Sequence, residues 1–415
     1  MTAETNFDAN PAMTPVSRSE RIELLDILRG AALFGIIAAN MRAFNSPMAT
    51  YFDHSVMWTG VADRIAQGFI DLFISGKFIT LFSFLFGIGF AVQMERASAR
   101  GVSPRSFYLR RLTVLLLMGL AHAFLLWWGD ILAPYALMGF LLYLFRNRSQ
   151  KTVLIWSAAL YCWPLLTFGG MLAAVSAGVP IPMPPRATPE TLQRVVEIYA
   201  HGSYAQIFQE RLHEMAFNAV GIVFFYPRVL GIFLFGLWFW RTGIIHNIAA
   251  HTALLKRCVA WGLAIGLAGN AAFVAISEIY HPDPMAPSGL SYLLNVLGSV
   301  GIPALSLAYA STVALLFCDP VWQSRLRPFA AVGRTALTNY LLQTVICTTI
   351  FNTWGFSLYG TFGPPAGLAL TVVIYAAQIP LSIWWLRRHT YGPMEWVWRV
   401  LTYGRSSVRE IPASG

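Results

Sequence analysis

The amino-acid sequence predicts an all-α, polytopic integral membrane protein of about ten transmembrane helices, with both termini in the cytoplasm. Its composition is the first indication, because 56% of the 415 residues are hydrophobic and 12% are charged, against about 25% charged in soluble domains. The second is that apolar windows of about 20 residues, the length that crosses a bilayer core, recur along the chain. The third is that basic residues gather in alternate loops.

The ten predicted spans cover approximately residues 25–44, 76–94, 109–128, 131–146, 152–174, 217–240, 256–278, 289–318, 329–351 and 364–386. The eighth is long enough to tilt or to break at Gly298, Gly301 or Pro303. Two further helices are expected outside the spans. One, near residues 56–75, is interfacial or re-entrant, and the other, near residues 188–214, is amphipathic and external.

The distribution of basic residues supports this count, because a missed helix would scramble the alternation of the loops. Of the 29 Lys and Arg residues, 22 lie in segments that a ten-helix arrangement places on one side. These segments are 18–29, 95–111, 146–151, 241–257, 319–334 and the tail after 386. Loops assigned to the other side near 45–60, 129–130, 279–288 and 352–363 contain no Lys or Arg.

We divide the chain on this basis into five parts. They are a disordered cytoplasmic tail (1–20), an N-terminal transmembrane bundle (21–146), the fifth span with the long external loop (147–216), a C-terminal transmembrane bundle (217–400) and a cytoplasmic tail (401–415). The net charge of +10 is dispersed among loops, which argues against nucleic-acid binding and leaves the lipid bilayer as the expected partner. The oligomeric state stays open.

Ionisable residues inside spans are the candidates for function, because each costs about 2.5–3.5 kcal/mol to insert. In the first span Asp26, Arg29 and Asn40 lie within about 60° of one another on a helix and form a polar stripe. Gly30 beside them would let a neighbouring helix or a ligand approach. The alternative is that Asp26 and Arg29 form a simple interfacial ion pair.

His122 lies in the third span, nearer its outer end, followed by Trp128 and Asp130 at the expected external interface. An intramembrane His is either a hydrogen-bonded packing residue or a group that transfers protons. Eight helical residues would separate His122 from Asp130 by about 12 Å. The two side chains therefore meet only if the chain turns sharply at Gly129.

The ninth span begins with polar residues at helical spacing, Thr335, Asn339 and Gln343, which are expected to share one face and to bond a neighbouring helix. Arg334 and Lys77, at the starts of spans, are candidates for binding or for simple snorkelling to the interface. The sequence contains no Walker A loop, GxSxG, HExxH or metal-spaced Cys or His cluster. ATP-driven transport and zinc hydrolysis are thus disfavoured, and no metal site is predicted.

Several polar stretches resemble the YeiB-like family of bacterial inner-membrane proteins, formerly a domain-of-unknown-function family. They are Leu25–Ala32 with Asn40, Lys77–Gly87, His122 with Trp128–Tyr135, Gly333–Gln343 and Gly392–Arg399. This resemblance implies a multi-pass protein of the bacterial inner membrane. The Asp26-x-x-Arg29-Gly30 opening is also remotely similar to a superfamily of transmembrane acyltransferases, which includes lysosomal heparan glucosaminide acetyltransferase and bacterial polysaccharide O-acyltransferases. Either His122 or His54 would then be the reactive histidine.

The resemblance implies acyl transfer from a cytoplasmic acyl-CoA to an unknown small-molecule or glycan acceptor at the outer side, with no permanently bound cofactor. Arg29 and Arg334 would contact the donor phosphates, because guanidinium matches phosphate geometry. The candidate catalytic residues are His122 as general base, Asp130 and Asp26. The candidate binding residues are Arg29, Asn40, Lys77, Trp128, Arg334, Asn339, Gln343 and Glu395. The rival hypotheses are a small-solute or proton-coupled transporter, in which the same groups form a relay, and a structural protein.

Overall fold

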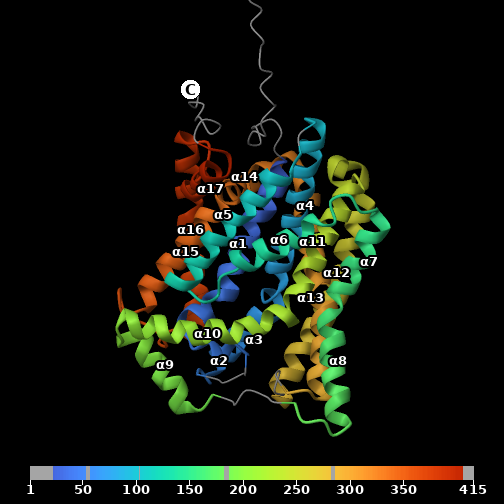
Figure 1. Cartoon of the computed structure of the whole chain (residues 1–415). Coiled ribbons are helices and arrows are strands. Elements are labelled where there is room, and N and C mark those ends of the chain that lie inside the picture. The colour runs from blue at the N-terminus through green and yellow to red at the C-terminus, as the bar shows by residue number, and fades with distance from the viewer. Residues whose placement is uncertain (1–21, 53–56, 102, 182–186, 282–285, 405–415) are drawn as a thin grey trace, which may run out of the picture.

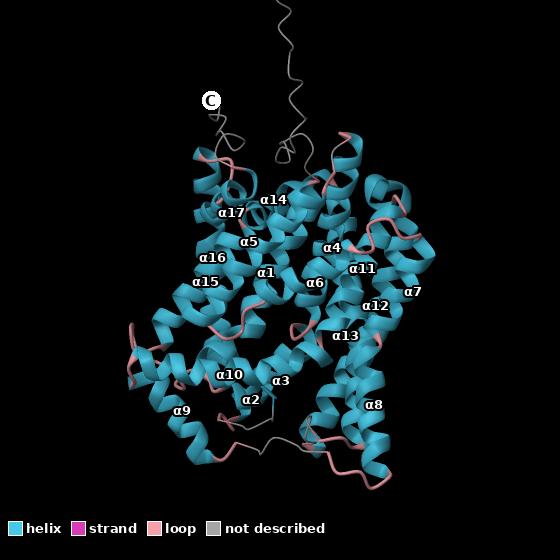
Figure 2. Cartoon of the chain, in the orientation of Figure 1, coloured by secondary structure: helices cyan, strands magenta, loops and turns pink. Residues whose placement is uncertain are grey.

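A computed structural model of the protein describes residues 22–52, 57–101, 103–181, 187–281 and 286–404, with the side chains of 51–52 and 218–223 left out. Within these ranges every regular element is a helix (Figure 2). Six of the helical segments there are long and apolar enough to cross a membrane, or seven if one bent pair counts as a span. The predicted all-helical membrane fold is confirmed at this level. Both expected tails, 1–20 and most of 401–415, lie outside the described residues.

The long apolar helices are α1 (Glu23–Asn45), α4 (Lys77–Ala99), α5 (Arg105–Leu125), α12 (Thr252–Tyr280), α13 (Gly289–Phe317) and α16 (Pro364–Arg388). Between them lie α2 (Met48–Phe52), α3 (Val61–Phe73), α6 (Leu132–Tyr143), α7 (Gln150–Tyr161), α8 (Trp163–Ser176), α9 (Pro189–His201), α10 (Tyr204–Phe224), α11 (Tyr226–Arg241), η1 (Ile244–His251), α14 (Pro320–Arg334), α15 (Ala336–Phe351) and α17 (Pro393–Tyr403).

Three predicted spans are interrupted helices. Span 152–174 bends by 41° between α7 and α8. Span 217–240 is divided between α10 and α11, and Pro227 in the first turn of α11 lacks the N–H that a continuous helix requires. Span 329–351 is divided at Thr335 between α14 and α15. The apolar windows of the sequence located these segments but not the breaks within them.

The expected weak point of the eighth span does not break, because α13 runs without interruption through Pro303. A proline leaves the carbonyl four residues earlier without its helical donor. Here that carbonyl, on Ser299, accepts a hydrogen bond from the Tyr161 hydroxyl at 2.7 Å. A neighbouring helix therefore satisfies the backbone group that Pro303 leaves unpaired.

The described parts of the basic segments lie at one end of the bundle, hereafter the basic end (Figure 1). Arg327 in α14 lies 3.3 Å from the carboxylate of Glu23, at the start of α1. Arg110 in α5 donates to the carbonyl of Leu401 in α17 at 2.9 Å. The described segment thus begins and ends at this basic end.

Helices α9 and α10 lie across the opposite end of the helices around α1, hereafter the capped end, while α8 and α13 run past them on one side (Figure 1). The sequence predicted one amphipathic helix at 188–214, whereas the structure has two, separated at Gly202. Val195 and Tyr199 are buried against the bundle, and the backbone carbonyl of Tyr199 accepts from the N–H of Thr353. These helices pack against the ends of neighbouring helices. The second expected helix, near 56–75, is α3.

Helix α1 lies at the centre, in contact with α4, α14, α15 and α16. One hydrophobic cluster of the core contains Leu28, from the predicted N-terminal bundle, together with Phe233 and Ala314, from the predicted C-terminal bundle. The proposed division into two bundles stays a prediction. The shared cluster fixes the helices around α1, which carries the first polar stripe.

Candidate functional site

Two glycines bring the first and ninth predicted spans into backbone contact. A Cβ on Gly30 would lie 2.0 Å from the carbonyl oxygen of Phe329, and one on Gly333 would lie 1.8 Å from that of Asp26. Larger residues at either position would force α1 and α14 apart. The helix approach expected at Gly30 is thus made by α14, and it places Arg334 beside Asp26 and Arg29.

These residues line a cavity of about 650 Å³ that starts at the basic end and runs between α1, α4, α5, α6, α15 and α17. Its charged lining residues, among those described, are Asp26, Arg29, Glu95, Arg96, Arg111, Arg334, Glu395 and Arg399. Five guanidinium groups therefore face three carboxylates. The cavity wall carries an excess of positive charge, which favours an anionic ligand.

Each carboxylate of the wall already accepts hydrogen bonds within the protein. Asp26 pairs with Arg29 at 2.8 Å, as the ion-pair interpretation of the sequence predicted. Glu95 accepts from the Trp240 indole N–H at 2.6 Å. Glu395 accepts from two backbone N–H groups in the first turn of α15, at 2.7 and 3.2 Å. Glu395 thus holds the start of α15 in place, a role that the sequence did not indicate.

Aromatic rings hold two of the arginines. The Arg111 guanidinium lies 3.8 Å from the centre of the Trp398 ring, and that of Arg399 lies 4.3 Å from the Tyr391 ring. Burial, reinforced by the charge of Arg111, lowers the pKa of Arg399. A guanidinium nonetheless stays charged at neutral pH. These stacked cations are suited to recognising phosphate.

Toward its inner end the cavity becomes apolar. The lining side chains there are Leu33, Ile36, Phe82, Leu85, Phe86, Leu112, Leu115, Leu132, Tyr135 and Tyr340. Tyr340, in α15, lines the cavity. The centre of its ring also lies 5.3 Å from the centre of the His122 ring. The cavity therefore combines a basic entrance with an apolar inner end beside a buried histidine.

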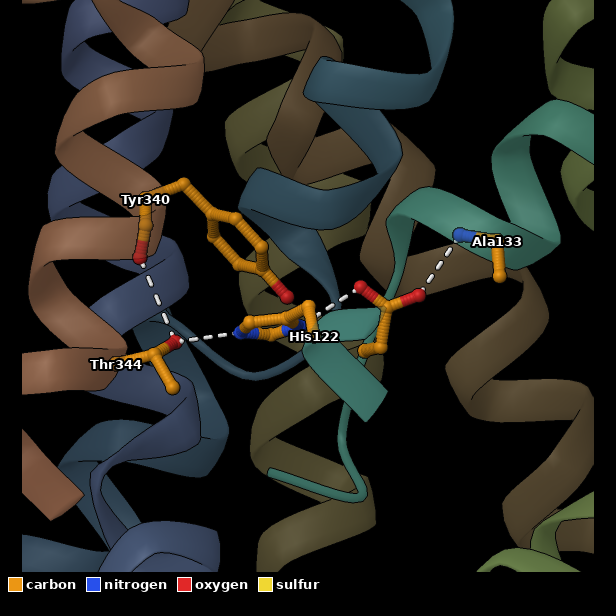
Figure 3. A network of polar contacts seen from close by, with 5 residues as sticks. His122, Ala133, Tyr340 and Thr344 are labelled. Carbon is orange, nitrogen blue, oxygen red and sulfur yellow. Dashed lines mark hydrogen bonds and ion pairs between the residues drawn. The ribbon is translucent and has the colours of Figure 1, made fainter. Parts of the chain in front are cut away.

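His122, labelled in Figure 3, forms a buried dyad with Asp130. The chain turns between α5 and α6, and Nδ1 of His122 lies 2.8 Å from Oδ1 of Asp130. The condition set by the sequence, a sharp turn at Gly129, is met. A Cβ at Gly129 would lie 2.4 Å from the Trp127 ring, so the turn requires glycine. Both dyad side chains are 1% exposed.

A third group completes this chain of contacts. Nε2 of His122 lies 3.0 Å from the hydroxyl of Thr344, which also lies 3.5 Å from the carbonyl of Tyr340 (Figure 3). With Asp130 as a carboxylate, which accepts hydrogen bonds and donates none, His122 donates from Nδ1. In the neutral imidazole Nε2 is then an acceptor, and the Thr344 hydroxyl donates its one proton to Nε2 instead of to the Tyr340 carbonyl. The order is carboxylate, imidazole, hydroxyl.

The position of Asp130 is fixed by the start of α6. Its Oδ2 accepts from the backbone N–H of Ala133 at 2.7 Å, and the positive end of the helix favours the carboxylate. Gly119 in α5 permits this approach, because a Cβ there would lie 2.3 Å from the Ala133 nitrogen. The dyad therefore depends on two glycines as well as on its own side chains.

Several predicted site residues lie elsewhere. Asn339 bonds Ser382, and Gln343 bonds Gln378, both in α16 at 2.9 and 2.8 Å, which matches the expectation of interhelical contacts. Three more predicted binding residues lie outside the cavity wall. Asn40 is half-buried, and Lys77 donates to the carbonyl of Asp71. Trp128 packs in a hydrophobic cluster at the capped end. His54 lies outside the described residues. Within the described ranges, no group of three or more His, Cys, Asp or Glu side chains is placed to hold a metal ion.

Sequence reasoning missed Arg111, Tyr340 and Thr344. A signal existed for Arg111, since it precedes His122 by eleven residues and so shares its helix face within about 20°. For Thr344 there was none, because its role depends on the packing of α15 against α5. Its spacing from Asn339 places it on a different face of α15 from the predicted polar stripe.

A second cavity, of about 860 Å³, adjoins the first at the basic end. Glu95, Trp240 and His246 line both cavities, and Arg146 and Arg241 add further positive charge to the second. The Trp240 and His246 rings lie 4.4 Å apart, edge to face. The basic end thus offers space for a ligand larger than the first cavity alone would hold.

Comparison with known proteins identifies the family. Residues 239–405 match the family model described as "Protein of unknown function (DUF418)". The chain is 35% identical to the uncharacterized protein YxaH of Bacillus subtilis (strain 168), over 94% of this chain and 96% of the relative. It is 31% identical to the uncharacterized protein YeiB of Escherichia coli (strain K12), over 92% and 96%. An uncharacterized 39.9 kDa protein of Bacillus acidopullulyticus is 30% identical, over 95% and 97%. The chain belongs to the YeiB-like, DUF418 family.

Proposed function

We propose that the protein is a membrane-embedded acyltransferase, which takes an acyl group from an acyl-CoA at the basic end and delivers it to an acceptor at the capped end. One observation carries this proposal. The cavity passes from five arginines to an apolar inner end, and Tyr340 there contacts the ring of His122. An acyl thioester of a phosphorylated carrier has the same distribution of charge and apolar length.

The arginines are suited to the phosphates of the donor. Arg29 and Arg334, the residues proposed from the sequence for this role, line the cavity together with Arg111 and Arg399, which supports a donor with several phosphates. The adjoining cavity, with Arg146, Trp240 and His246, has the charge and the aromatic surface for the nucleotide part of the carrier. No cofactor is bound permanently, and acyl-CoA enters as a substrate.

The orientation follows from the basic residues. We place the basic end in the cytoplasm, because 22 of the 29 Lys and Arg residues belong to segments assigned to that side. Counting the bent α7–α8 pair, α6, α11 and the broken α14–α15 segment as crossings, in addition to the six long apolar spans, gives ten spans with both termini inside, in a bacterial inner membrane. The acceptor, a small molecule or glycan, then approaches from the external side, where α9 and α10 cover the bundle.

His122 acts in this proposal as the general base. Asp130 holds the imidazole through Nδ1, so that Nε2 is available to take a proton from a hydroxyl. A buried, well-oriented base of this kind contributes about 10²–10⁴-fold to a proton transfer step.

Binding of the donor tests the proposal in purified protein in detergent. Radiolabelled acetyl-CoA and a long-chain acyl-CoA are expected to bind saturably, and Arg334→Gln and Arg399→Gln to weaken binding by about tenfold or more, about the weight of one charged hydrogen bond. Arg325→Gln is the matched control, because Arg325 is exposed on the same helix as Arg334 and lies outside the cavity lining. Absence of binding at millimolar donor, in wild type and Arg334→Ala alike, would rule out an acyl-CoA donor.

A transporter is the second candidate, and the broken spans favour it. The interruption at Thr335 adjoins the cavity, and transporters bind substrates at such breaks. Uptake of a labelled solute into proteoliposomes that is lost in His122→Ala, together with no acyl-CoA binding, would support the transporter over the acyltransferase.

A further inference from the structure

We propose that Thr344 is the nucleophile of the site, and that it carries the acyl group as an ester between the two ends of the protein. This inference rests on the proposed function and deepens it. Asp130, His122 and Thr344 follow one another at 2.8 and 3.0 Å, in the order carboxylate, imidazole, hydroxyl. This is the order in which an adjacent base activates a hydroxyl for covalent catalysis.

A packing role alone explains the arrangement less well. A buried His needs partners for both ring nitrogens, and Thr344 satisfies Nε2 in either interpretation. The carboxylate, however, is also buried and is positioned by the start of α6 and by two required glycines. A carboxylate placed in this way fixes one tautomer of His122, which gives the Thr344 hydroxyl an acceptor for its proton.

The location of Thr344 suits a carrier. On one side, Tyr340, one turn earlier on α15, belongs to the wall of the donor cavity. On the other side, the His122 ring lies 6.3 Å from that of Trp127, which stacks on Phe44 at 4.0 Å in the cluster of the capped end. Thr344 itself is fully buried. A swing of the Tyr340 ring would expose it to the cavity.

The transfer then takes two balanced steps. In the first, His122 takes the proton of the Thr344 hydroxyl, the oxygen attacks the thioester carbonyl, the C–S bond breaks, and the thiol leaves with the proton from His122. In the second, His122 takes a proton from the hydroxyl or amine of the acceptor, the acceptor attacks the carbonyl carbon of the Thr344 ester, the C–O bond to Thr344 breaks, and the Thr344 oxygen takes the proton back from His122. Donor and acceptor need never occupy the site together.

Acyl-enzyme trapping tests this directly. The full-length protein, in detergent and without acceptor, is mixed with [1-¹⁴C]acetyl-CoA and quenched in acid. We expect label approaching one acetyl group per chain, on the peptide that contains Thr344. The label should resist neutral hydroxylamine and be released by alkaline hydroxylamine, as an oxygen ester is, which distinguishes it from a thioester on the nearby Cys347.

Two variants and a control separate chemistry from folding. Thr344→Val keeps the shape and removes the hydroxyl, and should lose labelling and reduce transfer at least about 100-fold, the range of activated-nucleophile effects. Thr344→Ser should retain labelling. Thr348→Val, one turn further along α15 and also buried, should behave as wild type. Acetyl-CoA binding should be unchanged in all three.

Transfer by the wild type without trapped label, or full transfer by Thr344→Val, would overturn the inference and leave the acyltransferase proposal intact. Label on another residue would overturn it as well. Absence of acetyl-CoA binding in the wild type would instead refute the proposed function, and this inference with it.

Discussion

The contact between α5 and α6 gives the sharpest test of how the dyad is built. Substituting Gly119 by Ala places a Cβ 2.3 Å from the Ala133 nitrogen and 2.9 Å from Oδ2 of Asp130. Ordinary van der Waals contact begins near 3.4 Å. The neighbouring atoms are backbone and a held carboxylate, so the start of α6 must move by about 1 Å to relieve the overlap.

That displacement has a worked consequence. A shift of about 1 Å lengthens the His122–Asp130 contact from 2.8 Å to about 3.8 Å, beyond hydrogen-bond range. Overpacking of this kind costs about 1–3 kcal/mol in stability, and a 1 Å misplacement of a catalytic group costs about 10²-fold in rate. Gly170→Ala is the control, because a Cβ at this position meets nothing within 4 Å. Replacing this helical glycine by alanine should stabilise α8 by about 0.5–1 kcal/mol.

Thermal unfolding in detergent, followed by tryptophan fluorescence, measures the first effect, and acyl transfer measures the second. Gly119→Ala should melt several degrees below wild type and Gly170→Ala at or above it. A Gly119→Ala protein with the melting temperature and the transfer rate of the wild type would refute the argument that close helix contact positions Asp130.

Further predictions concern the dyad, the capped end and the polar stripe of α15. Asp130→Asn should lower transfer by about 10²–10⁴-fold with little change in acyl-CoA binding, because the amide no longer enforces one His122 tautomer; equal rates in the two proteins would contradict this. Burial raises the pKa of Glu214 in α10 to about 8, so the folded state holds a proton that the unfolded chain releases near pH 4.3. The melting temperature should therefore fall as pH rises from about 5 to 9, and Glu214→Gln should flatten that profile. Gln343→Leu should lower the melting temperature, since it leaves Gln378 without its 2.8 Å partner, while donor binding stays unchanged; weaker donor binding would return Gln343 to the ligand site.

The sequence predicted an all-helical fold with several membrane spans because the length and composition of apolar segments report on the bilayer itself. The count of ten spans and the topology, which rest on the basic loops, stay predictions. Pro227 explains the break before α11 once the structure is known. The break at Thr335 depends instead on Glu395 in α17, which is about sixty residues away in the sequence and accepts hydrogen bonds from the first turn of α15. Contacts of that range leave no local pattern.

Candidate site residues divide in the same way. Asp26, Arg29 and Arg334 were recognisable because ionisable groups are costly inside spans, and the structure places all three on one cavity wall. Asn339 and Gln343 follow an equally clear pattern, yet they contact α16, because periodicity identifies a polar face but not the partner it faces. Thr344 has no sequence signal of its own, since threonine is common in apolar helices and its importance comes from His122.

The central claim is that the basic cavity receives an acyl donor whose reactive end reaches His122 and Thr344. A structure of the protein with a non-hydrolysable thioether analogue of acyl-CoA tests it most directly. We predict density for the phosphates among Arg29, Arg334 and Arg399, and for the acyl end against a displaced Tyr340 ring. An analogue seated at the capped end or on the lipid-facing surface, or an empty cavity at saturating analogue, would contradict the account.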